Sequence, residues 1–358
     1  MKILTRYVLK HFFWVFGIAL FGFGGIYVVV DFFEKLDDIL EKKAAAMDAV
    51  LYFAYKVPAI LAQGIPIAAL LATLIGLGIL QRNREIMALR AAGLRAWAYA
   101  GPMVLASLTL VVVTFMAGET LGRSLNRKAA DLWQEKIEKK DVQLGFLQEN
   151  VWYHSQDYFL QARTYDAATK VFQGVSIYEL DEQFRLRRRL DAQRLIWAES
   201  SWRAEKGTVL AYKGGMAQHQ AFEHMDMALA LHPKDLAVAA ALPEELRWDL
   251  LYGYTKKLGA EGYNTVPYRV ELHMRVATAF ATLILGLIGV SLGLHLGHRG
   301  GIALGIALGL GLTFAYLVLL QIGASFARSE ILPVALGVWM PNGLFAAIGA
   351  ALWVRAPQ

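Results

Sequence analysis

The chain has 358 residues, of which 56% are hydrophobic and 18% are charged. Soluble domains are nearer half apolar and a quarter charged, so this composition excludes a soluble enzyme and a DNA-binding protein. The formal net charge of +6 therefore bears first on the orientation of the chain in a membrane. We predict no nucleic-acid partner.

The hydrophobic excess lies in six stretches that contain no Asp, Glu, Lys, Arg or His. Each is about as long as the roughly 20 apolar residues that cross a hydrocarbon core. The stretches are residues 12–30, 57–81, 96–118, 276–294, 300–327 and 331–354. We predict six transmembrane helices, the first of which is retained rather than cleaved as a signal peptide.

The long segment between the third and fourth stretches has ordinary polar composition and can bury a core of its own. Short alternating runs of β-forming residues occupy 151–163, 174–197 and 202–212, with helical patterns on either side. We therefore predict an α-helical polytopic membrane protein with an inserted all-β domain that is jelly-roll-like. The predicted domains are residues 1–118, 119–270 and 271–358.

Lys and Arg near the ends of the apolar stretches predict the orientation of the chain, because cytoplasmic loops are enriched in them. One side carries Lys2, Arg6, Lys10, Arg82, Arg84, Arg90, Arg95, Arg299 and Arg355. The other side carries fewer, and acidic residues outnumber the lysines of its first loop. We predict that both termini are cytoplasmic and that the middle domain is periplasmic.

Several kinds of chemistry have no motif in the sequence. There is no G-x-x-x-x-G-K-[ST] phosphate loop, no H-E-x-x-H and no G-x-S-x-G. The middles of the apolar stretches lack the ionisable groups that ion-coupled carriers use, and the chain has no cysteine. We predict no catalytic residue, no metal site and no cofactor on this chain, so any energy comes from elsewhere.

The cytoplasmic segment 81–97 reads QRNREIMALRAAGLRAW and mixes apolar residues with arginines. It is either an ordinary basic loop or a short surface helix that docks to a partner protein. In the second interpretation the docking helix spans about 82–93, and Glu85 is the acid that an arginine of the partner would seek. The candidate residues are Arg84, Glu85, Met87, Arg90 and Gly93.

Glycines recur at every fourth position around the fourth and fifth stretches. Small residues at this spacing let helices approach closely in lipid. Gly301, Gly305 and Gly309 form either a sliding contact, such as a gate, or tight packing within one subunit.

The sequence resembles the LptF/LptG family of lipopolysaccharide export permeases almost from end to end. The resemblance rests on LTRYVLKHFF at the start, on VPAILAQGIPIAALLATLIGLGILQRNREIMALRAAG, on the strand runs NVWYHSQDYFLQA and GVSIYELDEQFRLRRRLDAQRLIW, and on ILPVALGVWMPNGLFAAIGAALW at the end. The most specific element is R-E-x-M-x-x-x-A-A-G. Within the family, the strand runs are more similar to the LptG branch than to its LptF paralogue, which stays an alternative.

The resemblance implies a partner set and a location. It implies a heterodimer with an LptF-like permease in the bacterial inner membrane, an LptB-type ATPase dimer that binds ATP and Mg²⁺, and an LptC-type single-span protein. Lipopolysaccharide is the implied substrate. The first and fifth helices are implied to form lateral gates, and Glu85 is implied to face the ATPase.

One departure from the family concerns the outer end of the first helix, which is acidic here where some members are basic. The acidic residues are Asp31, Glu34, Asp37 and Asp38. Candidate ligands for lipid phosphates are therefore the nearby Lys35, Lys42, Lys43 and Lys56, unless these lysines only snorkel at the interface or a divalent cation bridges acid to phosphate.

Two other functions stay open at this stage. One is a non-transporting envelope scaffold, which would not copurify with an ATPase. The other is an efflux-type or lipoprotein-releasing ABC permease, which commonly has one helix before the outer domain and three after it, against three and three here.

Overall fold

The computed structural model describes most of the chain in segments separated by short gaps. These are residues 2–138, 147–154, 158–166, 169–181, 185–198, 201–213, 216–227, 229, 231–233, 243–244, 246–260, 263–296 and 301–356. They fold into two compact units. The helical unit comprises Met1–Trp133, Arg247–Thr255 and Asn264–Gln358, and the β unit comprises Gln134–Leu246 and Lys256–Tyr263. Residues 119–133, which the sequence grouped with the middle domain, thus pack within the helical unit.

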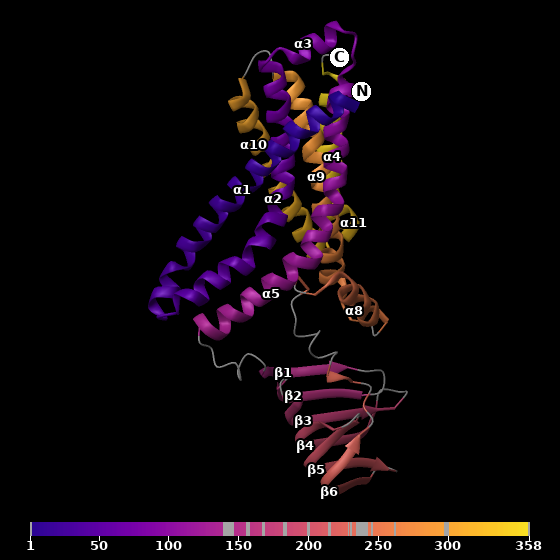
Figure 1. Cartoon of the computed structure of the whole chain (residues 1–358). Coiled ribbons are helices and arrows are strands. Elements are labelled where there is room, and N and C mark those ends of the chain that lie inside the picture. Colours follow the sequence, from indigo (N-terminus) through magenta and orange to yellow (C-terminus); the bar gives the residue numbers. More distant parts are fainter. Residues whose placement is uncertain are drawn as a thin grey trace. The chain divides into compact units, whose positions relative to one another are not determined.

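Among the described residues, six helices are long and apolar enough to cross a membrane, in agreement with the six charge-free stretches (Figure 1). They are α1 (Lys2–Glu41), α2 (Ala46–Arg82), α4 (Ala96–Ala117), α9 (Val266–Leu296), α10 (Gly301–Arg328) and α11 (Val334–Val354). Helix α1 has 40 residues and is about 60 Å long, twice the thickness of a hydrocarbon core. Its polar end therefore extends beyond the apolar stretch that predicted it.

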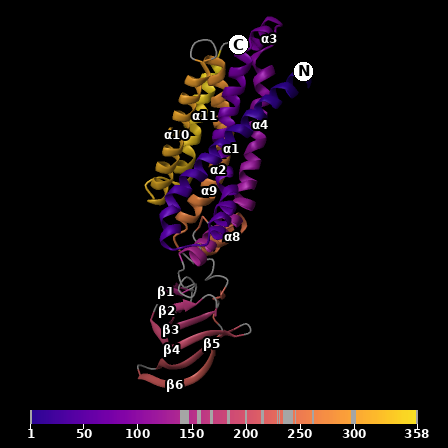
Figure 2. The same cartoon turned by 60° about the vertical axis from the view of Figure 1, so that its left-hand side comes forward.

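Helices α9 and α2 form the centre of the helical unit. Of the most apolar window of each span, 72% is buried in α9 and 67% in α2, against 11% in α1 and 22% in α10. Helix α9 contacts α2, α4, α10 and α11, an arrangement that Figures 1 and 2 show from two sides. Helices α1 and α10 are therefore the spans that expose most of their apolar surface.

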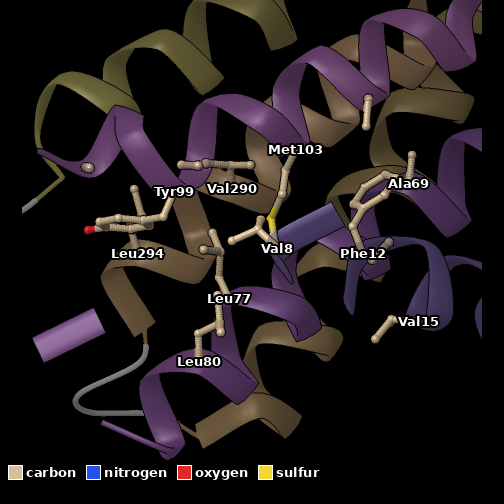
Figure 3. Packing of buried hydrophobic residues seen from close by; sticks show 14 of the residues in the cluster. Val8, Phe12, Val15, Ala69, Leu77, Leu80, Tyr99, Met103, Val290 and Leu294 are labelled. Atoms are coloured by element: carbon tan, nitrogen blue, oxygen red, sulfur yellow. The ribbon is translucent and has the colours of Figure 1, made fainter. Parts of the chain in front are cut away.

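Close packing of α9 against α2 and α4 depends on glycine. A methyl group at Gly289 would lie 2.6 Å from the carbonyl oxygen of Leu70, so only glycine lets the two backbones approach this closely. Beside this contact, Val8, Phe12, Tyr99 and other buried side chains from α1, α2, α4 and α9 form one continuous apolar cluster (Figure 3).

Polar side chains also join helices in this core. The hydroxyl of Tyr316 on α10 donates to Asn342 Oδ1 on α11 at 2.6 Å, and Asn342 Nδ2 donates to the carbonyl of Ala277 on α9 at 3.0 Å. The side-chain amide of Asn342 thus makes hydrogen bonds through both its oxygen and its nitrogen, and so holds three helices together. In a membrane such bonds matter because apolar side chains pack against lipid as readily as against another helix.

Shorter elements complete the helical unit and its connections. They are α3 (Glu85–Ala91), the π-helical turn η1 (Gly118–Gly122), α5 (Arg123–Leu132), the π-helical turn η2 (Trp133–Ile137) and α8 (Trp248–Ala260). The last of these begins at Trp248.

The described strands of the β unit form one antiparallel sheet in the order β1-β2-β3-β4-β5-β6. They are β1 (Leu147–His154), β2 (Tyr158–Asp166), β3 (Val171–Leu180), β4 (Leu186–Ala198), β5 (Ser201–Lys213) and β6 (Met216–Met227). Alternate residues of β2, such as Leu160 and Ala162, are buried in the core of the unit, as the period-two pattern predicted. The all-β middle region is confirmed. Its described strands pair in chain order, and the crossovers of a complete two-sheet jelly roll are not seen among them.

Candidate functional site

The connection between α2 and α4 contains the short helix α3, which is shorter than the predicted segment 82–93. It begins after Arg84, whose φ of 60° turns the chain out of α2. At its end the amide of Leu94 donates to the carbonyl of Leu89, and the amide of Gly93 donates to Arg90. This is a Schellman motif, in which the φ of 79° at Gly93 favours glycine. Gly93 therefore fixes the point where α3 stops.

One face of α3 is fastened to the helical unit. Ile86 is 1% exposed and belongs to the apolar cluster of Figure 3. Arg90 Nε donates to the hydroxyl of Tyr99 on α4 at 3.3 Å. These contacts hold the short helix in one position, although a helix of this length has little stability of its own.

The carboxylate of Glu85 is part of the same attachment. Its Oε1 accepts hydrogen bonds from the hydroxyl of Tyr7 on α1 at 3.0 Å and from Asn83 Nδ2 at 3.1 Å. The sequence predicted Glu85 as an acid presented to a partner. In the structure the same acid also joins α3 to α1, a role that the sequence pattern did not indicate.

The opposite face of α3 is open to solvent. Met87 is 62% exposed, and Ala88 and Ala91 are exposed beside it. We call these three residues the α3 surface. The exposed side chains of Arg82, Arg84 and Arg95 lie nearby in the chain. A small apolar surface next to cationic groups is suited to an apolar groove that has acidic residues at its edge.

The four candidate lysines differ in their surroundings. Lys56 Nζ lies 2.7 Å from Asp31 Oδ1 and 3.1 Å from the hydroxyl of Tyr52, so its ammonium is held by side chains of α1 and α2. Lys35 Nζ lies 4.7 Å from the ring centroid of Trp133. Only Lys42 and Lys43, at the turn after α1, are exposed without such a contact among those described. The pairing of Lys56 makes it a weaker candidate for a lipid phosphate than these two.

The glycines of α10 face the interior of the helical unit. A methyl group at Gly305 would lie 2.9 Å from Leu74 Cδ2, and one at Gly309 would lie 2.6 Å from Leu70 Cδ2. Gly301 begins α10, and the structure does not describe its surroundings. Gly305 and Gly309 therefore provide tight packing on α2 of the same chain. A sliding contact of α10 with another subunit would use its other face, where Leu308 and Phe314 are exposed.

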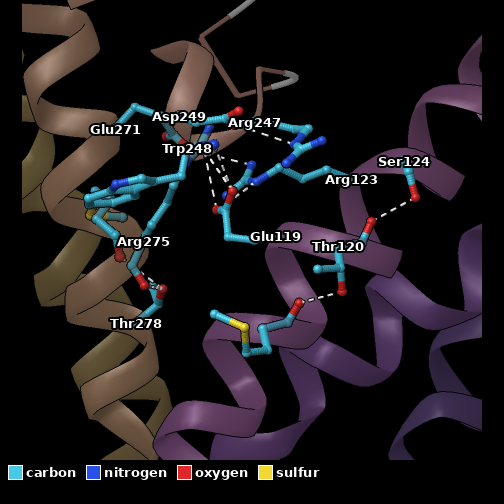
Figure 4. A network of polar contacts seen from close by, with 12 residues as sticks. Glu119, Thr120, Arg123, Ser124, Arg247, Trp248, Asp249, Glu271, Arg275 and Thr278 are labelled. Carbon is cyan, nitrogen blue, oxygen red and sulfur yellow. Dashed lines mark hydrogen bonds and ion pairs between the residues drawn. The ribbon is translucent and has the colours of Figure 1, made fainter. Parts of the chain in front are cut away.

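A cluster of charged side chains that the sequence did not reveal lies between α4, α5, α8 and α9 (Figure 4). Arg275 on α9, with only 3% of its side chain exposed, donates to Glu271 Oε1 at 2.9 Å and to Glu119 Oε1 at 3.2 Å. Arg123 Nε donates to Glu119 Oε1 at 2.9 Å. The sequence contains two Glu–Arg pairs at i, i+4 spacing, Glu119–Arg123 and Glu271–Arg275, just outside two apolar stretches. Nothing in the sequence showed that the two pairs meet.

The described residues contain no group of three or more His, Cys, Asp or Glu side chains close enough to hold a metal ion. The Glu119–Arg275 cluster has two acids and two arginines, so its charges balance without a cation.

Comparison with known proteins gives one consistent result. The family model described as lipopolysaccharide export system permease LptF/LptG matches residues 6–355. The chain is 22% identical to the lipopolysaccharide export system permease protein LptG of Escherichia coli K12, over 99% of this chain and 98% of that protein. It is 21% identical to the protein of the same name from Haemophilus influenzae, over 80% of each chain.

Proposed function

This chain belongs to the lipopolysaccharide export permease LptF/LptG family, and on that basis we propose that it extracts lipopolysaccharide from the inner membrane with energy from a separate ATPase. The family and the six apolar helices indicate an inner-membrane transporter permease. The observation that carries the proposed energy coupling is α3, which is fastened on one face by Ile86 and exposed on the other at Met87.

The ATPase subunit binds the α3 surface on the cytoplasmic side. Met87, Ala88 and Ala91 enter a groove of the ATPase, and the negative charge of Glu85 meets an arginine at its edge. Because α3 is anchored through Ile86, Glu85 and Arg90, a displacement of α3 is passed to α1 and α4. ATP and Mg²⁺ bind to the ATPase and not to this chain.

A second permease subunit of the LptF type binds the exposed faces of α1 and α10. These are the two spans that bury least of their apolar surface within the chain. The two subunits enclose an apolar chamber that opens sideways to the lipid. A single-span LptC-type protein takes up the lipid on the periplasmic side.

Sheltered passage is required by the chemistry of the substrate. Exposing several acyl chains to water costs about 0.8 kcal/mol for each CH₂ group, which amounts to tens of kcal/mol for one lipopolysaccharide molecule. A chamber between two subunits keeps the chains out of water, and its closure by ATP hydrolysis supplies direction. Three helices on each side of the β unit also distinguish this chain from the lipoprotein-releasing permeases considered above.

Copurification tests the proposal. The tagged chain, purified from native membranes, is expected to bring a nucleotide-binding subunit and a second six-helix permease. Met87→Asp is expected to lose the ATPase and to keep the second permease, whereas Met87→Leu, which preserves the apolar surface, keeps both. Purification of a folded chain that brings neither partner would favour the scaffold function instead.

A further inference from the structure

The carboxylate of Glu119, in the turn η1, joins three separate segments of the helical unit (Figure 4). Its Oε1 accepts from Arg123 Nε at 2.9 Å and from Arg275 Nη1 at 3.2 Å. Its Oε2 accepts from the backbone amide of Trp248 at 3.0 Å. Only 10% of the side chain is exposed. One buried carboxylate thus contacts α5, the first residue of α8 and α9.

These segments have a common place in the chain. The chain leaves the helical unit after Trp133, passes through the β unit, and re-enters the helical unit at Arg247. It enters the β unit once more at Lys256–Tyr263 before it returns at Asn264. The outgoing connection is η1 with α5, and the first returning connection is the start of α8. Glu119 therefore binds these two connections to the same helix, α9.

Packing around the start of α8 supports the same attachment. The ring of Trp248 lies edge-on to Phe115 of α4, with centroids 5.5 Å apart, and Tyr254 contacts Tyr268 of α9 at 5.5 Å. Leu251 of α8 is fully buried. The start of α8 is thus docked on the ends of α4 and α9 rather than being a loose linker.

We propose that Glu119 is the joint that makes the outgoing connection and the first returning connection of the β unit move together with α4 and α9. The two arginines neutralise its charge, so the carboxylate can stay buried and can accept the amide of Trp248 at the same time. A rearrangement of α4 and α9 is then transmitted to η1, α5 and α8 as one body. Without the joint, the packing of Trp248, Leu251 and Tyr254 still holds α8, but its first residue loses its fixed position against α9.

The absence of native cysteine permits a direct test on the purified chain in lipid discs. Spin labels are placed at the exposed positions Tyr252 on α8 and Arg269 on α9, and the distance distribution between them is measured. The first pair of variants is Trp248→Pro and Trp248→Ala. Both lose the indole ring, but only proline lacks the amide that Glu119 accepts, and proline is compatible with the first position of a helix.

We expect a broader distribution for Trp248→Pro than for Trp248→Ala. The second pair is Glu119→Gln and Glu271→Gln, each of which removes one carboxylate from the cluster, but only Glu119 contacts α8. Glu119→Gln is expected to broaden the distribution and to speed hydrogen exchange of the Trp248 amide about tenfold or more, as loss of a bond to a charged group does. Glu271→Gln is expected to change neither.

Equal distance distributions for Trp248→Pro and Trp248→Ala would overturn the proposal that Glu119 is a joint. An unchanged α8–α9 distance distribution in Glu119→Gln would overturn it as well. If Glu119→Gln does not fold, the Trp248 pair decides, because it leaves all four charges paired. None of these outcomes depends on which lipid the chain carries or on the ATPase.

Discussion

The hydroxyl of Tyr7 donates a hydrogen bond to Glu85 Oε1 at 3.0 Å, and so joins α1 to α3. Helix α1 buries least of its apolar window within the chain, and α3 is the proposed contact with the ATPase. The bond gives the first helix a direct connection to the docking element. In the proposed complex, a movement of the ATPase is passed to α1 through this bond without passing through the centre of the helical unit.

Two substitutions separate the charge of Glu85 from its hydrogen bond. Glu85→Gln keeps an oxygen that can accept from Tyr7 but removes the negative charge, whereas Tyr7→Phe keeps the charge and removes the bond. We expect Glu85→Gln to weaken ATPase binding by about tenfold or more, the effect of losing a charge-assisted bond. Tyr7→Phe is expected to leave binding nearly unchanged and to reduce the coupling of ATP hydrolysis to transport. Binding by the purified subunits measures the first effect. Equal ATPase affinity for Glu85→Gln and the unchanged chain would show that the charge of Glu85 does not contribute to ATPase binding.

The ion pair between Lys56 and Asp31 is expected to contribute to stability rather than to lipid binding. Lys56→Met leaves the carboxylate of Asp31, with 8% of its side chain exposed, without its cation. Because 21% of the Lys56 side chain is exposed, the cost is expected to be below the roughly 3 kcal/mol for removing one partner of a fully buried pair. The melting temperature in detergent should fall, and the double variant Asp31→Asn with Lys56→Met should recover part of the loss. The matched control Lys42→Met, at an exposed position, should not change it.

For lipid binding the expectation is reversed, because Lys42 and Lys43 are expected to contribute and Lys56 is not. Charge reversal of the exposed Lys42 and Lys43 should reduce photocrosslinking to lipopolysaccharide while the melting temperature stays constant. Crosslinking that does not diminish would assign these lysines to interfacial snorkelling.

Two glycines of the membrane helices should respond in opposite ways to alanine. At Gly289 the new methyl group would meet the backbone of Leu70, so Gly289→Ala is expected to cost about 2 kcal/mol of stability through overpacking. At Gly311, where no atom lies within 4 Å of the added carbon, alanine is expected to be neutral or to stabilise the helix by up to about 1 kcal/mol. Thermal unfolding of the two variants measures the difference. Equal melting temperatures would mean that α9 and α2 are not in close backbone contact.

The outward face of α10 is expected to touch the second permease subunit. A cysteine in place of Phe314, which is 71% exposed, should form crosslinks to that subunit in native membranes. A cysteine in place of Tyr316, which is fully buried, should form none. Crosslinks from Tyr316 alone would show that α10 turns a different face to its partner.

The membrane helices could be predicted from the sequence because crossing a bilayer imposes a local requirement, a long run without charge. The β unit was predicted for a similar reason, since alternation of apolar residues is also local. Helices α1 and α2 extend beyond the apolar stretches that predicted them. A helix can continue past the bilayer through polar residues, so the end of the apolar stretch does not mark the end of the helix. Residues 119–133, which were grouped with the middle domain, pack in the helical unit, and the contacts of Glu119 with Arg275 and Trp248 join distant parts of the chain.

In the candidate site, too, local features could be predicted from the sequence and contacts between distant residues could not. The position of α3 and the importance of Gly93 followed from local sequence, but the bond from Tyr7 to Glu85 spans 78 positions. The glycine spacing identified residues that share one face of α10. It could not say whether that face meets α2 or another subunit, because periodicity carries no information about the neighbour.

The most direct measurement of the central claim follows lipopolysaccharide in vesicles that contain the chain, its second permease subunit and the ATPase, together with a periplasmic acceptor. ATP is expected to drive crosslinking of the lipid to the acceptor, and Met87→Asp is expected to abolish this transfer while Met87→Leu supports it. Transfer that continues at the original rate with Met87→Asp, or that requires no ATP, would contradict the account of a permease driven through α3.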